Sequence, residues 1–457
     1  MLGRLLDSRA AFLVAAPIAI PLGVLAALEP VWALAGVGVV ILVLIVVTRV
    51  DLLMLCLAAA LPWEGTLQYP SEEISVVKIL GVLLFIAWLM RALVRSEPLR
   101  VSPTLGWAGF FMFAVLLSVL FSPDPAESVF DALRYALFVV FFFLMLQLTQ
   151  TIDEVRRVVR VVVLSCTVAA VVGLYGFIAL DLERAAGPIY DPNDFAYLMV
   201  CALPLACYLL ATEKRRRLVW AICCTLLIGA TLATLSRGAL VGLAALAPWG
   251  IATRRIPLTG VLLGVVAVLS VAGLAFTLWA PVLQDRLSMK SRIADRNVDA
   301  REALWAGALR MAEGRPLTGV GPGRFGAESA GYVRNNPIPL GEDPAVHNSY
   351  LHVLAEVGVL GFVGFVGFLI ASWRLLARGR RRAIGVGDVD GRRLATAMQA
   401  SLLVAVVSGV FLSEQFTTPF WMIGALATVV AGVPQAVRVT GPSRALLQRE
   451  RVAAAAG

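Results

Sequence analysis

Three residues of this 457-residue chain place a charge or an acid–base group beside an apolar stretch: Arg237, Arg301 and His347. An arginine side chain can bind phosphate oxygens with two parallel hydrogen bonds. A histidine can accept or donate a proton near neutral pH. Together these residue types favour a site that binds an anionic group and moves a proton.

Each of the three also has a structural alternative. Arg237 lies between two apolar segments, where an arginine either extends to the lipid interface or lines a wet cavity. The spacing of Asp299 and Glu302 predicts a helix that begins at Asp299. The free N–H groups of its first turn would lie beside Arg301 and could bind an anion with it. The alternative is that Arg301 is a solvated surface arginine. His347 precedes Asn348, a suitable N-cap, and the alternative is an interfacial polar side chain.

Polar residues at the start of a further apolar segment form a second candidate group. Asp191 precedes Pro192, a pairing typical of an N-cap followed by the first helical residue. Asn193 and Asp194 come next and are predicted to face the outer side, where they can bind substrate. Capping of the helix is the alternative role for this group.

Four other residues are candidates for substrate binding. Arg324 follows a glycine-rich stretch that lets backbone approach a ligand closely, although it matches neither a Walker nor a dinucleotide motif; an ordinary loop is the alternative. Asn348 and Tyr350 follow His347 directly. Glu356 is spaced four residues from His352, so the two can pair on one helix face, either in a site or as a buried structural pair.

The composition indicates how these residues are positioned. Hydrophobic residues make up 60% of the chain and charged residues only 15%, with a mean hydropathy of +0.85, whereas soluble domains carry about 25% charged residues. The chain is therefore predicted to be an all-α polytopic membrane protein, and a soluble enzyme or a disordered protein is excluded. All six cysteines lie in apolar stretches and there are only two histidines, so we expect no disulfide framework, no metal site and no cofactor.

Apolar segments long enough to cross a bilayer, about 20 residues each, recur along the chain. We predict twelve to fourteen spans, the third being short enough to be re-entrant, near 11–28, 31–48, 51–64, 78–95, 104–121, 129–148, 158–178, 195–211, 218–235, 238–252, 257–279, 350–373, 396–412 and 419–436.

The distribution of Lys and Arg sets the expected orientation, because cytoplasmic loops carry an excess of both. It places both termini inside and residues 280–349 in one long extracytoplasmic loop of a cytoplasmic membrane protein. The net charge of +9 is then topological, so nucleic acid is not an expected partner, while membrane lipids are. The predicted regions are N-terminal spans (1–184), central spans (185–279), the loop (280–349), C-terminal spans (350–436) and a cytoplasmic tail (437–457).

Two local patterns complete the prediction. Leu304, Ala308 and Met311 form an apolar stripe at helical spacing within the loop, which Gly314 and Pro316 then end. Glycines recur every three residues from 358 to 367 and indicate a helix face for close packing.

The order of these motifs resembles the O-antigen ligase and O-antigen polymerase superfamily. The resemblance rests on Gly187 with Pro192-Asn193, on Leu235-Ser236-Arg237-Gly238, on Arg301 and Trp305 with Pro316-Leu317-Thr318-Gly319-Val320-Gly321, and on His347-Asn348-Ser349-Tyr350-Leu351 with Glu356-Val357-Gly358. It covers about residues 185–435.

The resemblance implies a metal-independent, inverting transfer of a glycan from an undecaprenyl (polyprenyl) pyrophosphate carrier to a glycan, lipid or protein acceptor at the outer membrane face. It implies that Arg237 and Arg301 hold the pyrophosphate and that His347 takes the acceptor's proton or orients its hydroxyl. The alternative is a membrane transporter of a small anion or solute. Transporters place their sites near the bilayer midplane between repeated halves, whereas these candidates cluster at one edge and no repeat is found.

Overall fold

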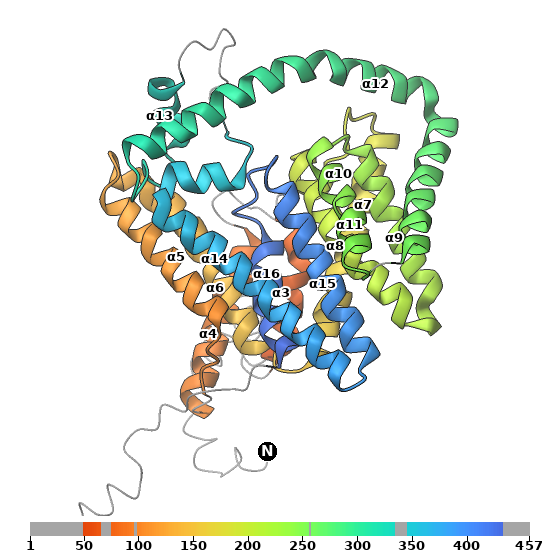
Figure 1. Cartoon of the computed structure of the whole chain (residues 1–457), viewed down its shortest axis with the longest axis horizontal. Coiled ribbons are helices and arrows are strands. Elements are labelled where there is room, and N and C mark those ends of the chain that lie inside the picture. Colours follow the sequence, from red (N-terminus) through yellow and green to blue (C-terminus); the bar gives the residue numbers. More distant parts are fainter. Residues whose placement is uncertain (1–48, 65–74, 96–97, 256, 334–344, 433–457) are drawn as a thin grey trace, which may run out of the picture.

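The computed structural model describes residues 49–64, 75–95, 98–255, 257–333 and 345–432, and in this part of the chain it contains helices and no strands. The helices pack side by side as a bundle, and one of them arches over an end of it (Figure 1). The longer helices are α3 (Val50–Ala60), α4 (Val76–Arg95), α5 (Pro103–Leu120), α6 (Pro125–Leu148), α7 (Ile152–Ala179), α8 (Pro192–Thr212), α9 (Arg217–Ala233), α10 (Arg237–Ala244), α11 (Leu246–Ala252), α12 (Leu258–Gly314), α13 (Phe325–Tyr332), α14 (Ser349–Gly385), α15 (Val389–Ser408) and α16 (Thr418–Ala431).

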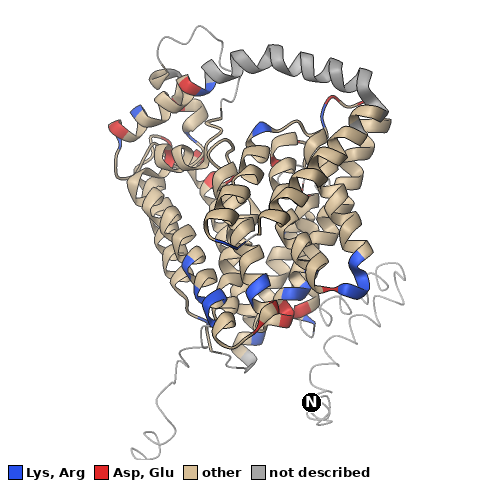
Figure 2. Cartoon of the chain, turned by 45° about the vertical axis from the view of Figure 1, so that its right-hand side comes forward, with Lys and Arg blue, Asp and Glu red and all other residues tan. Residues whose placement is uncertain are grey.

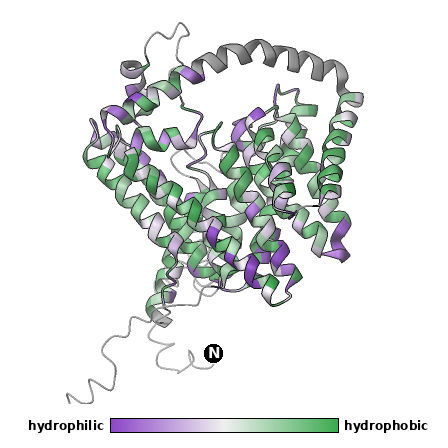
Figure 3. Cartoon of the chain, in the orientation of Figure 1, coloured by the Kyte–Doolittle hydropathy of each residue, from purple (hydrophilic) through white to green (hydrophobic). Residues whose placement is uncertain are grey.

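Seven helices of the described residues are long and apolar enough to cross a membrane, and four shorter apolar helices accompany them. Hydrophobic residues follow the helices along their length, while hydrophilic residues gather toward the helix ends (Figure 3). The prediction of an all-α polytopic membrane protein is confirmed. The spans expected at 11–28 and 31–48, and the tail from 437, lie outside the described residues.

The span expected at 238–252 corresponds to the short apolar helix Arg237–Ala252, which is interrupted at Ala245 between α10 and α11. Pro248 has no N–H to donate to the carbonyl of Ala244, and its ring crowds that carbonyl. By contrast, α8 continues through Pro204, as membrane helices can when their neighbours compensate for the lost bond.

The loop helix expected to begin at Asp299 is predicted wrongly. Helix α12 runs without a break from Leu258 to Gly314, so Arg301 lies far inside a helix and not in its first turn. Backbone N–H groups inside a helix already donate to the preceding turn, and the free N–H groups proposed beside Arg301 are therefore absent. The predicted end of this helix, at Gly314, is confirmed.

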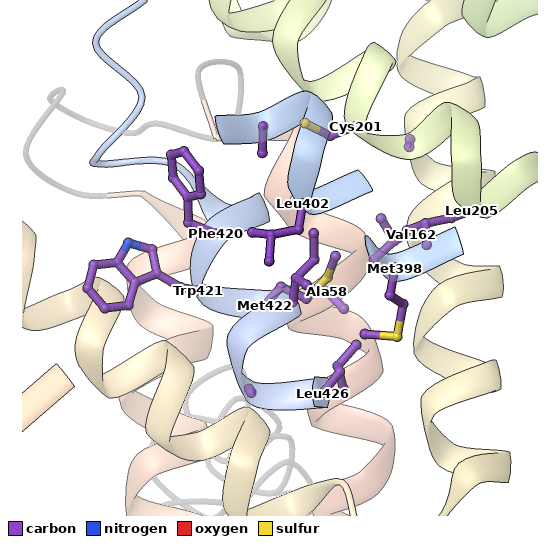
Figure 4. Packing of buried hydrophobic residues seen from close by; sticks show 14 of the residues in the cluster. Ala58, Val162, Cys201, Leu205, Met398, Leu402, Phe420, Trp421, Met422 and Leu426 are labelled. Atoms are coloured by element: carbon purple, nitrogen blue, oxygen red, sulfur yellow. The ribbon is translucent and has the colours of Figure 1, made fainter. Parts of the chain in front are cut away.

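The main core lies inside the bundle and joins helices that are distant in sequence. Phe420, Trp421 and Met422 of α16 pack near Leu402 of α15 and Ala58 of α3 (Figure 4). Lipid removes much of the hydrophobic drive between membrane helices, so close packing of such side chains has to hold the bundle together.

The glycines of α14 serve two purposes. A Cβ at Gly364 would come within 2.8 Å of Phe111, and one at Gly367 within 2.3 Å of Trp107, so both allow α5 to pack closely, as predicted. Gly358 instead adopts φ 69° and kinks α14, and a Cβ there would lie 2.4 Å from the backbone of Leu317. Glycine is the residue that tolerates both the positive φ and this approach.

The two ends of the bundle differ in their charges (Figure 2). At the end we call the basic end, Lys and Arg side chains gather with acidic partners, including Arg156 with Asp390 and Arg160 with Glu213. The opposite end, called the site end, is where α8, α10, α14 and α16 begin and where α12 passes over the bundle. Asn193 and Asp194 lie at the start of α8, Arg237 begins α10, and His347, Asn348 and Tyr350 lie at the start of α14.

Candidate functional site

A small second core at the site end positions Arg301 and His347. The predicted stripe of Leu304, Ala308 and Met311 is buried here against a set of apolar residues from three other segments: Val320, Phe325, Val346 and Ala355. The stripe is thus confirmed, and it fixes the C-terminal part of α12 against the start of α14. The exposed positions of this part of α12 are Glu302, Leu309, Glu313 and Gly314.

Trp305 connects the two candidate residues. Its indole Nε1–H donates to the carbonyl oxygen of Val346 at 3.0 Å, one residue before His347, and Arg301 lies one helical turn before Trp305. The positive charge of Arg301 acts on His347: burial first, and then Arg301, lower the pKa of the imidazole, while Asp191 acts in the opposite direction. The bond from Trp305 to Val346 therefore brings together the two segments that carry Arg301 and His347.

Arg301 is half-buried and has no hydrogen bond or ion pair with the other described residues. Burial alone accounts for the lowered pKa of its guanidinium. An arginine partly withdrawn from water without a carboxylate partner binds an incoming anion strongly, because both groups gain from the contact.

The backbone of His347 is in the left-handed region, with φ 51°. A residue other than glycine adopts this conformation at a cost of roughly 1–3 kcal/mol, and such residues concentrate at functional sites. Leu235, two residues before Arg237, has φ 54°, and Tyr190, just before Asp191, has φ 69°. Three of the polar groups at the site end therefore follow or occupy strained backbone positions.

The side chains of Asn348 and Tyr350 are engaged within the protein. The Asn348 side-chain oxygen caps α14 by accepting from the N–H groups of Tyr350 and Leu351, each at 3.0 Å. The Tyr350 hydroxyl donates to the carbonyl of Val406 at 2.7 Å. Their contacts support the helix that His347 precedes.

Glu356 joins the glycine-rich segment to α14. It is 1% exposed, and its Oε1 accepts from the backbone N–H of Phe325 at 3.1 Å and lies 3.2 Å from Nε2 of His352. The expected pair of His352 and Glu356 is therefore present and buried. The kink at Gly358 also frees nearby carbonyls, and those of Ala355 and Glu356 accept from Val320 and Gly321.

Arg324 lies at the end of the same segment but contacts acidic side chains. Its guanidinium is 3.6 Å from Asp124, before α6, and 3.7 Å from Glu328 on α13. These ion pairs tie the glycine-rich segment to the connection between α5 and α6. The side chain is 18% exposed, which leaves it little surface for a further partner.

The start of α8 is built as the sequence indicates. The carboxylate of Asp191 accepts from the N–H groups of Asn193 and Asp194. The Asn193 side chain accepts from Nη2 of Arg184 at 2.8 Å, and Nε of Arg184 donates to the carbonyl of Thr234 at 2.7 Å. Arg184, which the sequence reasoning missed as a site residue, thus links α8 to the turn before Arg237.

Glu414 is a second residue that the sequence reasoning missed. It lies in the connection between α15 and α16 and is fully buried, and its pKa is raised by burial and then by the neighbouring carboxyl of Asp194. Two carboxyls in such a place do not both ionise readily. Its signal in the sequence is a lone acidic residue between two apolar spans, which by default marks a functional position.

Arg237 lies at the same end but apart from the other two catalytic candidates. It is exposed at the first position of α10, and it has no hydrogen bond or ion pair with Arg301, His347 or another described residue. A Cβ at the next residue, Gly238, would lie 2.9 Å from Phe411, so α10 packs directly against the connection between α15 and α16.

Together these residues form a candidate site at one end of the helix bundle of a polytopic membrane protein, with an arginine that could bind an anion and a histidine that could move a proton. The described residues contain no group of three or more His, Cys, Asp or Glu side chains placed to hold a metal ion.

Residues 221–366 match the family model described as O-antigen ligase. The match confirms the resemblance to the O-antigen ligase and polymerase superfamily, and with it glycan transfer of the ligase type in general. It includes all three catalytic candidates, Arg237, Arg301 and His347. A search of the curated proteins finds no match to the chain.

Proposed function

We propose that this protein transfers a glycan from a polyprenyl pyrophosphate carrier to an acceptor at the outer face of the cytoplasmic membrane, with inversion and without a metal ion. The acceptor is a glycan, a lipid or a protein. In this assignment the site end faces outward and the basic end faces the cytoplasm, in accord with the excess of Lys and Arg at the basic end.

One observation carries the proposal: a half-buried arginine without an acidic partner in the described chain stands next to a histidine of lowered pKa. Transfer of a glycan from a pyrophosphate carrier needs these two functions. The leaving group develops negative charge, which an arginine stabilises, and the attacking hydroxyl loses a proton, which a neutral imidazole accepts.

The reaction balances with these groups alone. The acceptor oxygen attacks the anomeric carbon of the donor sugar, and the bond from that carbon to the pyrophosphate oxygen breaks. The new glycosidic bond forms, polyprenyl pyrophosphate leaves with the bonding electrons, and the hydroxyl proton passes to His347. Arg301 binds the departing pyrophosphate from α12, and Arg237 binds it from the membrane edge. Asp194 contacts the sugar hydroxyls from the start of α8.

The test uses the purified full-length protein with lipid-linked glycan extracted from cells that carry the gene. Transfer to a membrane fraction from the same cells is measured with and without EDTA. We expect transfer that persists in the chelator and releases polyprenyl pyrophosphate. Loss of transfer in EDTA, with recovery on adding a divalent ion, would contradict the metal-independent mechanism.

A second experiment separates the enzyme from the transporter. Proteoliposomes that contain the protein are assayed for uptake of small anions and for transfer of the glycan in parallel. Uptake without any transfer would overturn the proposed function.

A further inference from the structure

His347 is held from both sides by elements that are remote in the sequence. On one side, Val346 is buried in the second core and its carbonyl accepts from the indole of Trp305. On the other side, Ser349, the first residue of α14, is fully buried and hydrogen-bonded to the connection between α15 and α16. His347 has a left-handed backbone between these two anchors, and such a backbone persists only where the surroundings determine it strongly.

Ser349 makes an unusually complete set of hydrogen bonds with that connection. Its N–H donates to the carbonyls of Gly409 and Leu412 at 2.8 and 2.9 Å, and its hydroxyl donates to Leu412 at 2.8 Å and accepts from the N–H of Glu414 at 2.7 Å. One small residue thus joins the start of α14 to the backbone of three residues of the connection by four hydrogen bonds.

Each of these two anchors connects His347 to the segment of a different arginine. Trp305 lies one turn from Arg301 on α12, so its bond to Val346 fixes His347 relative to Arg301. The connection that holds Ser349 packs through Phe411 on Gly238, the neighbour of Arg237. That second anchor fixes His347 relative to Arg237.

We propose that Trp305 and Ser349 are positioning residues that hold His347 at its working distance from the two arginines. This inference rests on the proposed function and extends it, because it names what preorganises the base. Neither residue touches substrate in this assignment. A displacement of about 1 Å in a catalytic group can lower a rate by about 10²-fold, so loss of either anchor should be visible.

The variants are Trp305→Phe, which keeps the ring and removes the N–H donor, and Ser349→Ala, which removes the hydroxyl. Matched controls are Trp220→Phe, whose indole donates to Glu213 at 3.1 Å at the basic end, and Ser329→Ala, whose hydroxyl donates to Gly326 at 2.7 Å within α13. We expect kcat to fall about 10- to 100-fold in the two anchor variants with little change in KM, and both controls to keep the parent kcat.

The same substitutions are then made in the His347→Ala background. If the anchors act through His347, they should change the residual rate by less than about twofold there, because the group they position is gone. An equal loss in both backgrounds would show a general structural role and overturn the inference.

The position of His347 can also be tested by a chemical measurement that does not depend on enzyme activity, because the chain has only two histidines. In a His352→Gln background, the rate at which diethyl pyrocarbonate carbethoxylates imidazole, followed by the absorbance of that product, reports His347 alone. We expect faster modification after Trp305→Phe or Ser349→Ala and the parent rate after Trp220→Phe. Unchanged reactivity and kcat in both anchor variants would refute positioning, whereas full activity of His347→Ala would instead refute the proposed function.

Discussion

Two arginines at the site end differ from the paired arginines at the basic end, whereas Arg324, also at the site end, is paired with Asp124 and Glu328. At the basic end, arginines meet acceptors within the protein: Arg156 contacts Asp153 at 2.6 Å and also Asp390, and Arg255 donates to Gln399 at 2.7 Å. At the site end, Arg237 and Arg301 have no hydrogen bond or ion pair with the other described residues.

This difference separates charges that hold the bundle together from charges kept for a ligand. A paired arginine stabilises the contact between two helices, as Arg160 and Glu213 do for α7 and the end of α8. Arg301 makes no such contact with the described residues, and its partial burial costs free energy that a bound anion can offset. Positive φ occurs at Tyr190, Leu235 and His347 of the site end, and also at Asp181 and Arg254.

The largest expected effect is at His347. His347→Ala should lower turnover by about 10²–10⁴, the range for loss of a general base, while leaving the thermal unfolding temperature close to that of the parent. Turnover and unfolding of the purified variant are measured together. If the variant transferred glycan at the parent rate, His347 would not be the base of the reaction and the proposed site would be wrong.

Substitution of the two arginines should have the next largest effect. Arg301→Lys and Arg237→Lys keep the charge but lose the two-pronged hydrogen-bonding geometry, so each should lower the rate by about 10²–10³. The matched control is Arg156→Lys at the basic end, which should leave turnover per folded molecule unchanged. Steady-state kinetics of the three variants decide whether charge is used differently at the two ends.

Substitutions at the basic end should lower the stability of the protein without lowering the rate of glycan transfer. Glu213→Gln weakens the contacts with Arg160 and with the indole of Trp220, and we expect a loss of about 1 kcal/mol in the free energy of unfolding, since the pair is partly exposed. Unfolding in a denaturant series measures it. A large fall in turnover without a change in stability would contradict a structural role for the charges of the basic end.

The smallest expected effect is a shift in pH dependence. A base must be neutral, so activity should fall as the pH drops through the pKa of His347, which burial and Arg301 hold below 6.5. Arg301→Gln removes one of the causes that lower this pKa. The acidic limb of the pH–rate profile should therefore move upward, toward 6.5, in that variant. His352, which also lowers this pKa, and Asp191, which raises it, remain the same in both proteins.

The sequence by itself determined the features that depend on neighbouring residues. The apolar segments gave the helices, Asp191 and Asn348 cap α8 and α14 as their positions indicate, and the stripe from Leu304 to Met311 is buried. These signals are local, because periodicity and capping act within one or two helical turns. The capping spacing at Asp299 failed because the chain continued as one helix, which already satisfies the backbone groups that a cap would bind.

Only the tertiary structure decided which polar groups meet. The bond from Trp305 to Val346 joins residues 41 positions apart, and the bond from Glu414 to Ser349 joins residues 65 apart. No period or motif encodes such pairs, since they follow from how whole helices pack. The same holds for the kink at Gly358, which exists because backbone from the glycine-rich segment lies against α14. The sequence provided the arginines and the histidine, and packing placed Arg301 beside His347 while leaving both arginines free of acidic partners in the described chain.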